Sequence, residues 1–267
     1  VGGEIDINGP AGQTLGDQSL PAVTGLADGG FYVAWSDFDS ATDKDIVGAV
    51  FNASGAFVRG QDGDATGLDM DEVSVAQLGA GSVAAWLNRS GTNADISLKI
   101  YDAAGGTVSY LPVANTFTAG FQQSPAIATA PDGQEIAVVW DNTADFTITG
   151  RIFNSGGLES AAEFQIASSA GVLRVADPVV AWLNNETFAV AWRELNTFNA
   201  GNNQIRVRIF DGQSSVVVAL TGNILVNSTI TDSQQEPTIV ALPNGGFVIA
   251  WEDSSGVGGD TSTAIRL

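Results

Sequence analysis

The feature that most constrains the fold is an internal repeat. The phrase at residues 18–35, QSLPAVTGLADGGFYVAW, returns as QQSPAIATAPDGQEIAVVW at 122–140 and as QQEPTIVALPNGGFVIAW at 234–251. Weaker copies lie between these three. Tryptophan ends every copy, at Trp35, Trp86, Trp140, Trp192 and Trp251. Repeats of roughly 20–50 residues are typical of solenoids and propellers, in which each repeat is one supersecondary unit.

Each copy has the residue pattern of several short strands. A proline-led apolar run, a glycine-rich turn and an alternating run ending in Trp are followed by a polar loop. A third run then goes from Ile to an aromatic residue, at 46–51, 96–101, 148–153 and 205–210. Alternation with a period of two predicts half-buried strands. Five units of about four strands each predict an all-β fold, a five-bladed β-propeller of four-stranded antiparallel blades.

The repeat also predicts where the units begin and end. We expect one propeller domain over residues 1–267, with units at 18–68, 69–121, 122–173, 174–232 and 233–267 plus 1–17. Residues 4–8, EIDIN, alternate like a strand, and the fifth unit lacks an outer strand. The N-terminal strand is therefore expected to join the last blade and close the ring, which would remove an exposed sheet edge. A solenoid, or a larger propeller built from several chains, is the alternative architecture.

Composition excludes several classes of function. The net charge is −20, with only ten Lys and Arg residues. Nucleic acids and anionic membrane surfaces call for a basic footprint, so neither is an expected partner. The chain has no Cys and no His, which removes thiolate chemistry, the commonest general base and the commonest zinc ligand. No apolar run has the roughly 18 residues of a membrane span, so membrane insertion is not expected either.

The repeat tryptophans and the aromatic residue that ends each third run are predicted to form the core between blades, because their spacing is fixed. Two residues after each Trp stands a side-chain oxygen: Asp37, Asn88, Asn142, Glu194 and Asp253. Asp and Asn at a strand end often cap the next turn through its backbone N–H groups. The alternative is a set of oxygens on one propeller face that binds a cation or sugar hydroxyls.

The first polar loop favours a cation. Asp37, Asp39, Asp43 and Asp45 lie within nine residues. Ca²⁺ takes six to eight oxygen ligands, and closely spaced aspartates supply them. These four residues are the predicted metal site, with Ca²⁺ the expected ion, although the loop does not have EF-hand spacing. In a chain with thirty acidic residues, a solvated acidic face is the alternative.

Trp182 breaks the repeat. It is a Trp outside the repeat position, and small residues replace it in units one, two and five, at Gly25, Ala76 and Ala241. An exposed indole is a good platform for the apolar face of a sugar. A ligand site is therefore predicted around Trp182 with residues of the following loop, Glu194, Phe198, Asn199 and Asn202, because an aromatic ring with amides and a carboxylate suits a sugar. The alternative is that Trp182 fills a gap in an irregular blade.

Three phrases carry a resemblance: DQSLPAVTGLADGGFYVAW at 17–35, GGEIDIN at 2–8 and RIFNSGG at 151–157. They resemble the propeller-type repeats of large secreted bacterial proteins, which often also carry RTX-type calcium-binding nonapeptides and leave the cell by type I secretion. The resemblance implies a secreted or cell-surface protein, with adhesion or polysaccharide contact as the usual supposition. The RTX nonapeptide is absent from this sequence, so its calcium site cannot be transferred.

The sequence thus predicts a non-catalytic extracellular binding module for a glycan or cell-surface polysaccharide. A polysaccharide-active enzyme is one alternative, since paired carboxylates hydrolyse glycosides without histidine. A structural unit of a surface or secreted array is the other. The sequence leaves the oligomeric state open.

Overall fold

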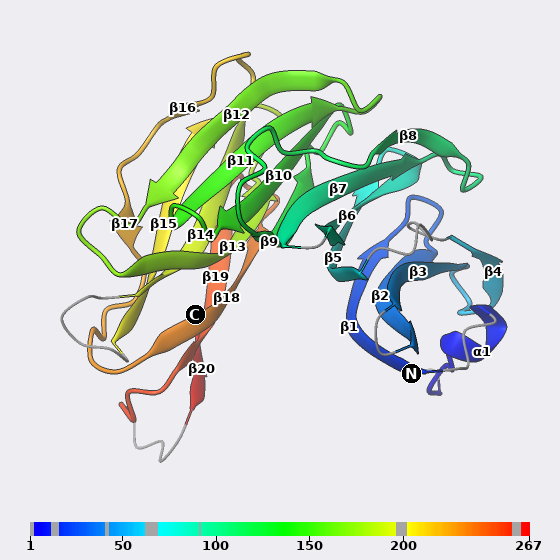
Figure 1. The fold of residues 1–267 in the computed structure, drawn as a ribbon, viewed down its shortest axis with the longest axis horizontal. Coiled ribbons are helices and arrows are strands. Elements are labelled where there is room, and N and C mark those ends of the chain that lie inside the picture. Colours follow the sequence, from blue (N-terminus) through cyan, green and yellow to red (C-terminus); the bar gives the residue numbers. More distant parts are fainter. Residues whose placement is uncertain are drawn as a thin grey trace. The chain divides into compact units, whose positions relative to one another are not determined.

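The computed structural model of the chain is built almost entirely of antiparallel strands (Figure 1). It describes residues 3–11, 16–40, 43–61, 69–90, 92–195, 202–257 and 263–267. Within these ranges the side chains of residues 10, 11, 39, 40 and 43 are not described. One short helix, α1 (Asn8–Ala11), is the sole helix in this part of the chain.

The strands form five sheets that follow the sequence repeat. The first sheet contains β1 (Asp17–Gly25), β2 (Phe31–Ser40), β3 (Asp43–Phe51) and β4 (Phe57–Gly60). The second contains β5 (Asp69–Leu78), β6 (Gly81–Ser90), β7 (Asn93–Tyr101) and β8 (Thr107–Leu111). The third contains β9 (Gln122–Thr129), β10 (Glu135–Asn142), β11 (Thr147–Asn154) and β12 (Glu159–Ser168).

The last two sheets depart from four regular strands. The fourth contains β13 (Arg174–Trp182), β14 (Thr187–Leu195), β15 (Asn203–Asp211), β16 (Val218–Ala219) and β17 (Ile224–Leu225). Here β16 and β17 both pair with β15, so they are two pieces of one interrupted outer strand. The fifth contains β18 (Gln234–Ala241), β19 (Phe247–Asp253) and β20 (Ala264–Arg266), three strands in its described residues.

These sheets are the blades of a five-bladed β-propeller, which confirms the predicted fold class. The chain divides into two compact units, which are described separately. Unit 1 comprises residues 1–125 and 155–157, and unit 2 comprises 126–154 and 158–267. Blades 1 and 2 belong to unit 1. Blades 4 and 5 belong to unit 2, together with most of blade 3.

Each blade has a backbone irregularity in its first strand. One residue in that strand has a left-handed conformation, with φ between 49° and 55°. These residues directly precede the proline of the repeat, or Val73 where blade 2 lacks it: Leu20, Glu72, Ser124, Asp177 and Glu236. In blades 1, 2, 4 and 5 the pairing register also shifts at this point. The Gln-x-x-Pro phrase of the sequence therefore encodes a β-bulge, which bends and twists the strand.

Three of the repeat tryptophans lie in the core between neighbouring blades, as predicted, whereas Trp35 clusters with residues of its own blade and with Ile7. In unit 1, Trp86 of blade 2 packs against Tyr32 and Ala34 of blade 1. In unit 2, Trp192 and Trp251 lie in clusters with residues of the preceding blade. The aromatic residues that end the third strands are also buried: Phe51, Tyr101, Phe153 and Phe210. The fixed spacing thus reflects one packing arrangement repeated from blade to blade.

The N-terminal segment differs from the prediction. Residues 3–7 form no strand, and α1 begins at Asn8. The Asp6 carboxylate accepts hydrogen bonds from the backbone N–H groups of Asn8 and Gly9. Ile7 packs beside Trp35 on blade 1. The predicted pairing of residues 4–8 with the last blade is wrong in this structure, because turn formation at Asp6 and Gly9 overrides the short alternating pattern.

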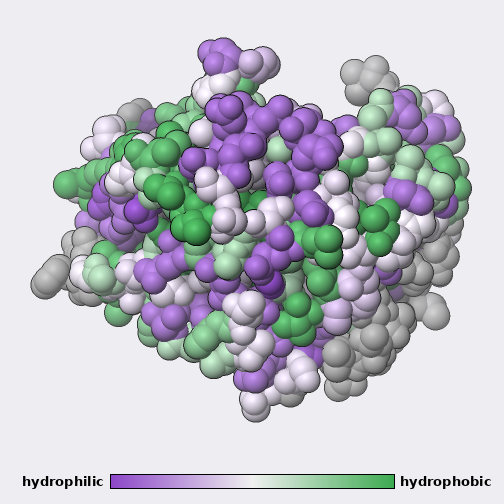
Figure 2. All heavy atoms as spheres, turned by 90° about the horizontal axis from the view of Figure 1, so that it is seen from above, coloured by the Kyte–Doolittle hydropathy of each residue, from purple (hydrophilic) through white to green (hydrophobic). Residues whose placement is uncertain are grey.

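The surface shown in Figure 2 mixes apolar and polar residues. Exposed apolar side chains occur in both units, for example Val23 at 66% and Val240 at 58%. Within the described ranges, no helix is long and apolar enough to cross a membrane.

Candidate functional site

In blades 1 and 5, the strand end after the repeat Trp carries a shared hydrogen-bond arrangement. In blade 5, Gln234 accepts from the Trp251 indole at 2.9 Å and donates to Asp253 at 2.9 Å. In blade 1, Gln18 donates to Asp37 at 2.9 Å, but its carbonyl accepts from Asn8. The glutamine and the Asp two residues after Trp are therefore partners across the first two strands. This contact explains why both recur in the sequence.

Two buried carboxylates, Asp253 and Asp71, have lowered pKa values. Burial alone would raise the pKa of Asp253, but hydrogen bonds from Ser255, Gln234 and Arg266 outweigh it and lower the pKa to about 2. In blade 2, desolvation of Asp71 is likewise outweighed by hydrogen bonds from Lys44 and Ser36 of blade 1, so its pKa is lowered. These groups stabilise the contacts between strands and blades.

The predicted metal site is only partly within the described structure. Asp37 is 1% exposed and bonded to Gln18, and Asp45 is its partner across the β2–β3 ladder. The side chains of Asp39 and Asp43 lie outside the described residues. In the described part of the chain, no three acidic side chains form a cluster that could hold a metal ion. The calcium site stays a prediction.

Trp182 is not the exposed platform expected from the sequence. Its side chain is 3% exposed and belongs to the core of unit 2. Its ring lies 5.2 Å from that of Phe188, and Gly212 leaves room for its outer edge. The alternative prediction, that Trp182 fills a gap in the blade, is therefore confirmed. Burying an indole is strongly favourable when the core has space for it.

The predicted ligand residues do not converge. Glu194 faces Val175, seven residues from Trp182 along β13, which is roughly 20 Å of extended chain. Glu194 accepts from Arg206 at 3.0 Å, and Asn202 accepts from Gln204. Phe198 and Asn199 lie outside the described residues. Trp182 and Glu194 thus lie at opposite ends of blade 4 and cannot contact one small ligand.

A pocket does exist at the Trp182 end. It has a volume of about 510 Å³, within the range of small-molecule sites. The turns after the first strands of three successive blades form its walls. Blade 3 contributes Pro131, blade 4 contributes Trp182, Leu183, Asn184 and Asn185, and blade 5 contributes Ala241, Leu242 and Pro243. An apolar wall with a few polar groups is the usual composition of a ligand pocket.

The two asparagines give this pocket its polar chemistry. The side-chain amide oxygen of Asn184 accepts hydrogen bonds from the backbone N–H groups of Glu186 and Thr187, at 2.7 and 2.9 Å. The side-chain amide oxygen of Asn185 accepts a hydrogen bond, at 3.0 Å, from the backbone N–H of Asp132 in the turn of blade 3. Both side chains are exposed, and both amide oxygens are fixed by these bonds. The amide NH₂ groups therefore remain as donors, two per residue.

Asn184 and Asn185 are not among the site residues predicted from the sequence. The turn there reads Leu-Asn-Asn-Glu, whereas the corresponding turns of blades 1, 3 and 5 contain Asp-Gly or Asn-Gly. The loss of glycine from this one turn, next to the unusual Trp182, was a signal that could have been used.

Comparisons with known proteins support the fold. No protein-family model and no curated protein sequence matches the chain. Among solved structures, an α-L-arabinofuranosidase from Lactobacillus brevis matches with a TM-score of 0.51 and 10% identity, over 97% of this chain and 92% of that one. A Trypanosoma rangeli sialidase in complex with the inhibitor DANA matches with a TM-score of 0.56 and 12% identity, over 92% of this chain and 45% of that one. Kuenenia stuttgartiensis hydrazine synthase matches with a TM-score of 0.54 and 12% identity, over 90% of this chain and 78% of that one.

Because the sequence identities are so low, these similarities concern the fold alone. The same fold occurs in two glycoside-cleaving enzymes and in an enzyme of a different chemistry, so the fold by itself does not assign an activity.

Proposed function

We propose that this β-propeller is a carbohydrate-binding module and that the pocket beside Trp182 binds a neutral glycan. The observation that carries the proposal is that Asn184 and Asn185 line a pocket with apolar walls while their amide oxygens are held by backbone N–H groups. Two of the structural relatives, an arabinofuranosidase and a sialidase, are by name proteins that act on sugars. Their likeness supports the ligand class through the fold only.

The chemistry of the pocket suits a sugar. Sugar hydroxyl oxygens accept hydrogen bonds from amide NH₂ groups, and sugar C–H faces pack on apolar side chains such as Leu242 and Pro243. Because the amide oxygens are already held by backbone N–H groups, the donors are oriented before the ligand binds. Preorganised groups lose less conformational entropy on binding.

A titration with the neutral oligosaccharides that score highest on a glycan array tests the proposal. Asn184→Asp and Asn185→Asp keep the carbonyl that caps the turn but remove the NH₂ donor. Each is expected to weaken binding about three- to tenfold, the value of one or two net hydrogen bonds. Asn52→Asp is the matched control, because Asn52 caps its own turn in unit 1 in the same way.

A second pair of variants tests the position of the ligand. Leu242 is 38% exposed and lines the pocket, so Leu242→Arg should fill the pocket and abolish binding. Leu220 is 54% exposed in the same unit and does not line the pocket, so Leu220→Arg should leave binding unchanged. Equal effects of the two arginines, or no glycan binding to the wild-type chain, would refute the proposal.

Hydrolysis of a polysaccharide is a second candidate. It is favoured by the fold shared with the arabinofuranosidase and the sialidase. Most glycoside hydrolases use two carboxyl groups at the bond that breaks. The Trp182 pocket is lined by no acidic residue among the described ones, whereas a second pocket in unit 1 is lined by Asp28 and Asp102. Release of new reducing ends that disappears in Asp28→Asn and Asp102→Asn would establish this alternative over simple binding.

The proposed setting is the bacterial cell surface or the extracellular medium, as the resemblance to secreted propeller repeats implies. The acidic composition and the absence of cysteine are compatible with it. Detection of the protein in culture medium or on intact cells of its source would test this, and recovery from the cytoplasm alone would contradict it.

A further inference from the structure

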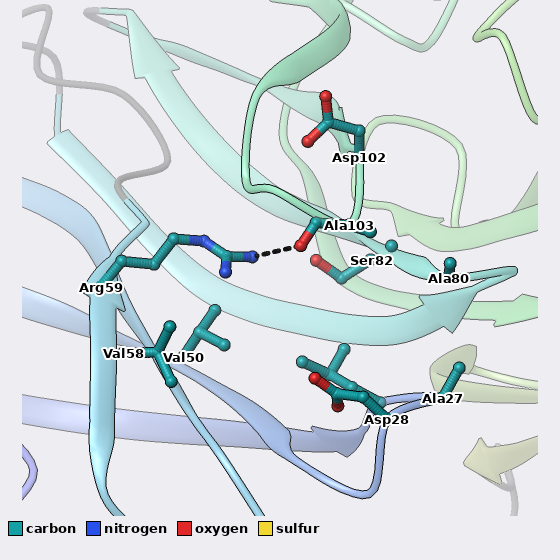
Figure 3. Close-up of a pocket in the computed structure, with 11 residues that line it drawn as sticks. Ala27, Asp28, Val50, Val58, Arg59, Ala80, Ser82, Asp102 and Ala103 are labelled. Carbon is teal, nitrogen blue, oxygen red and sulfur yellow. Dashed lines mark hydrogen bonds between the residues drawn. The ribbon is translucent and has the colours of Figure 1, made fainter.

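Unit 1 contains a second pocket, between blades 1 and 2, that is separate from the proposed glycan-binding site (Figure 3). Its volume is about 330 Å³. Leu26, Val50 and Val58 of blade 1 and Ala80 and Ala103 of blade 2 supply most of its apolar wall. The polar groups on the wall are Asp28, Arg59, Ser82 and Asp102. A largely apolar pocket with a few convergent polar groups is a candidate ligand site.

Among these polar residues of the pocket, Arg59 differs from most other basic residues of the chain. Seven of the ten basic residues form ion pairs with carboxylates: Lys44, Arg89, Arg151, Arg174, Arg193, Arg206 and Arg266. Among the described residues, Arg59 instead has two long contacts with neutral oxygens, 3.3 Å to the carbonyl of Ala103 and 3.4 Å to Gln61. Its buried Nε has no hydrogen-bond partner there. The guanidinium is therefore a cation whose donors are poorly satisfied by this part of the protein.

The surroundings hold Arg59 in place at the pocket. Gly105 makes this possible, because a Cβ there would lie 2.1 Å from the Arg59 Nε. Figure 3 shows the guanidinium reaching across the pocket toward Ala103 and the hydroxyl of Ser82. Ser82 is 3% exposed and accepts from buried Gln61 at 2.9 Å, so its own hydroxyl proton is available to donate. Arg59 and Ser82 thus offer donors from opposite sides.

The two carboxylates at the pocket have different surroundings. The Asp102 carboxylate accepts from the backbone N–H of Gly106 and, in Figure 3, points away from the guanidinium. Asp28 accepts from the backbone N–H of Gly30 with one oxygen, and its carboxylate lies on the opposite rim from Asp102. Asp28 can therefore accept a hydrogen bond from a ligand hydroxyl while Arg59 and Ser82 bind an anionic group.

From this arrangement we infer that the pocket between blades 1 and 2 binds a hydroxylated organic carboxylate of the size of a hexuronic acid. The carboxylate lies against Arg59 and Ser82, and a ring hydroxyl donates to Asp28. Arginine suits this role because its planar fork binds carboxylates through two parallel hydrogen bonds. The inference does not rest on the proposed function, since the Trp182 pocket lies in unit 2 and shares no residue with this one.

Calorimetric titration of the intact chain with D-galacturonate, D-galactose and acetate tests the inference. D-Galactose has the same ring without the carboxylate, and acetate has the carboxylate without the ring. D-Galacturonate is expected to bind at least about tenfold more tightly than either, because a charge-assisted bidentate pair and a hydroxyl bond both contribute. Galactose binding as tightly as galacturonate, acetate binding as tightly as galacturonate, or no binding of galacturonate at millimolar concentration would overturn it.

Two variants assign the binding to Arg59. Arg59→Gln should remove the preference for galacturonate over galactose. Arg151→Gln is the matched control, because it removes the same charge from an ion pair with Glu159 on blade 3, in unit 2. If Arg59→Gln binds galacturonate as wild type does, or if both variants lose the same affinity, the assignment is wrong.

Discussion

At the scale of single residues, blade 4 shows two linked substitutions in the repeat. Trp182 stands where blades 1 and 5 have Gly25 and Ala241, and Gly212 stands where blades 1 and 2 have Ala53 and Ala103. A Cβ at position 212 would lie 2.4 Å from the Trp182 ring. The lost methyl group thus makes room for the added indole. This exchange of volume buries Trp182 and leaves only part of it at the pocket.

Gly212→Ala is expected to destabilise the protein by about 1–3 kcal/mol, the usual cost of overpacking a filled core. Denaturation by urea, followed by far-UV circular dichroism, measures the change. Gly222→Ala is the control, because a Cβ at Gly222 meets nothing within 4 Å. The packing explanation fails if the two alanines have the same effect.

At the scale of elements, the most regular feature is the bulge in the first strand of every blade. Its left-handed residue is never glycine, although each such residue costs roughly 1–3 kcal/mol of backbone strain. The same conformation recurs at the residue before Pro21, Pro125, Pro178 and Pro237. In unit 1 the bulges of two blades are also linked, because the Glu72 carboxylate accepts from the Ser124 backbone N–H at 2.6 Å. The bulge is therefore part of how neighbouring blades meet.

Glycine substitution in β1 separates this strain from ordinary strand propensity. Leu20 and Val23 lie in the same strand, and both are exposed, at 49% and 66%. Because φ is 50° at Leu20, Leu20→Gly should be neutral or stabilise the protein by up to about 1 kcal/mol. Val23→Gly should destabilise it by about 0.5–1 kcal/mol. Urea midpoints decide the matter, and a larger loss for Leu20→Gly than for Val23→Gly would exclude backbone strain at the bulge.

At the scale of the whole molecule, the charge balance is dominated by acid. Most basic side chains are used in internal ion pairs, and two of these pairs join successive blades: Lys44 with Asp71, and Arg174 with Asp141. The remaining carboxylates give the chain its net charge of −20. Such a surface favours cations as partners and disfavours polyanions.

Calcium is expected to raise the melting temperature through the loop between β2 and β3. A specific site stabilises the folded state by about 2.7 kcal/mol when the free ion is at 100 times its dissociation constant. Scanning calorimetry in CaCl₂, with MgCl₂ at equal ionic strength as the control for screening, measures this. Asp39→Asn with Asp43→Asn should remove the difference between the two salts. Equal melting temperatures of the wild-type chain in both salts would rule out a calcium-selective site.

Local sequence patterns specify the architecture of the blades and much of their core. Repeat period, strand alternation and the spacing of Trp and Phe depend on local order along the chain, and each copy reports the same packing. Even the recurring Gln and Asp could be recognised, although their pairing across two strands, as in Gln234 and Asp253, needed the structure.

Contacts between distant parts of the chain set the features that local patterns do not predict. The burial of Trp182 depends on Gly212, thirty residues away, and the N-terminal segment lies on blade 1 because Ile7 finds an apolar surface beside Trp35. Each candidate pocket has walls from different blades, so its residues lie far apart in the sequence. Trp182 and Glu194 are close in sequence terms but lie at opposite ends of a strand pair. Function in a repeat fold depends on such distant contacts, because the repeated units share one backbone pattern and a binding site forms where side chains of neighbouring blades and turns meet.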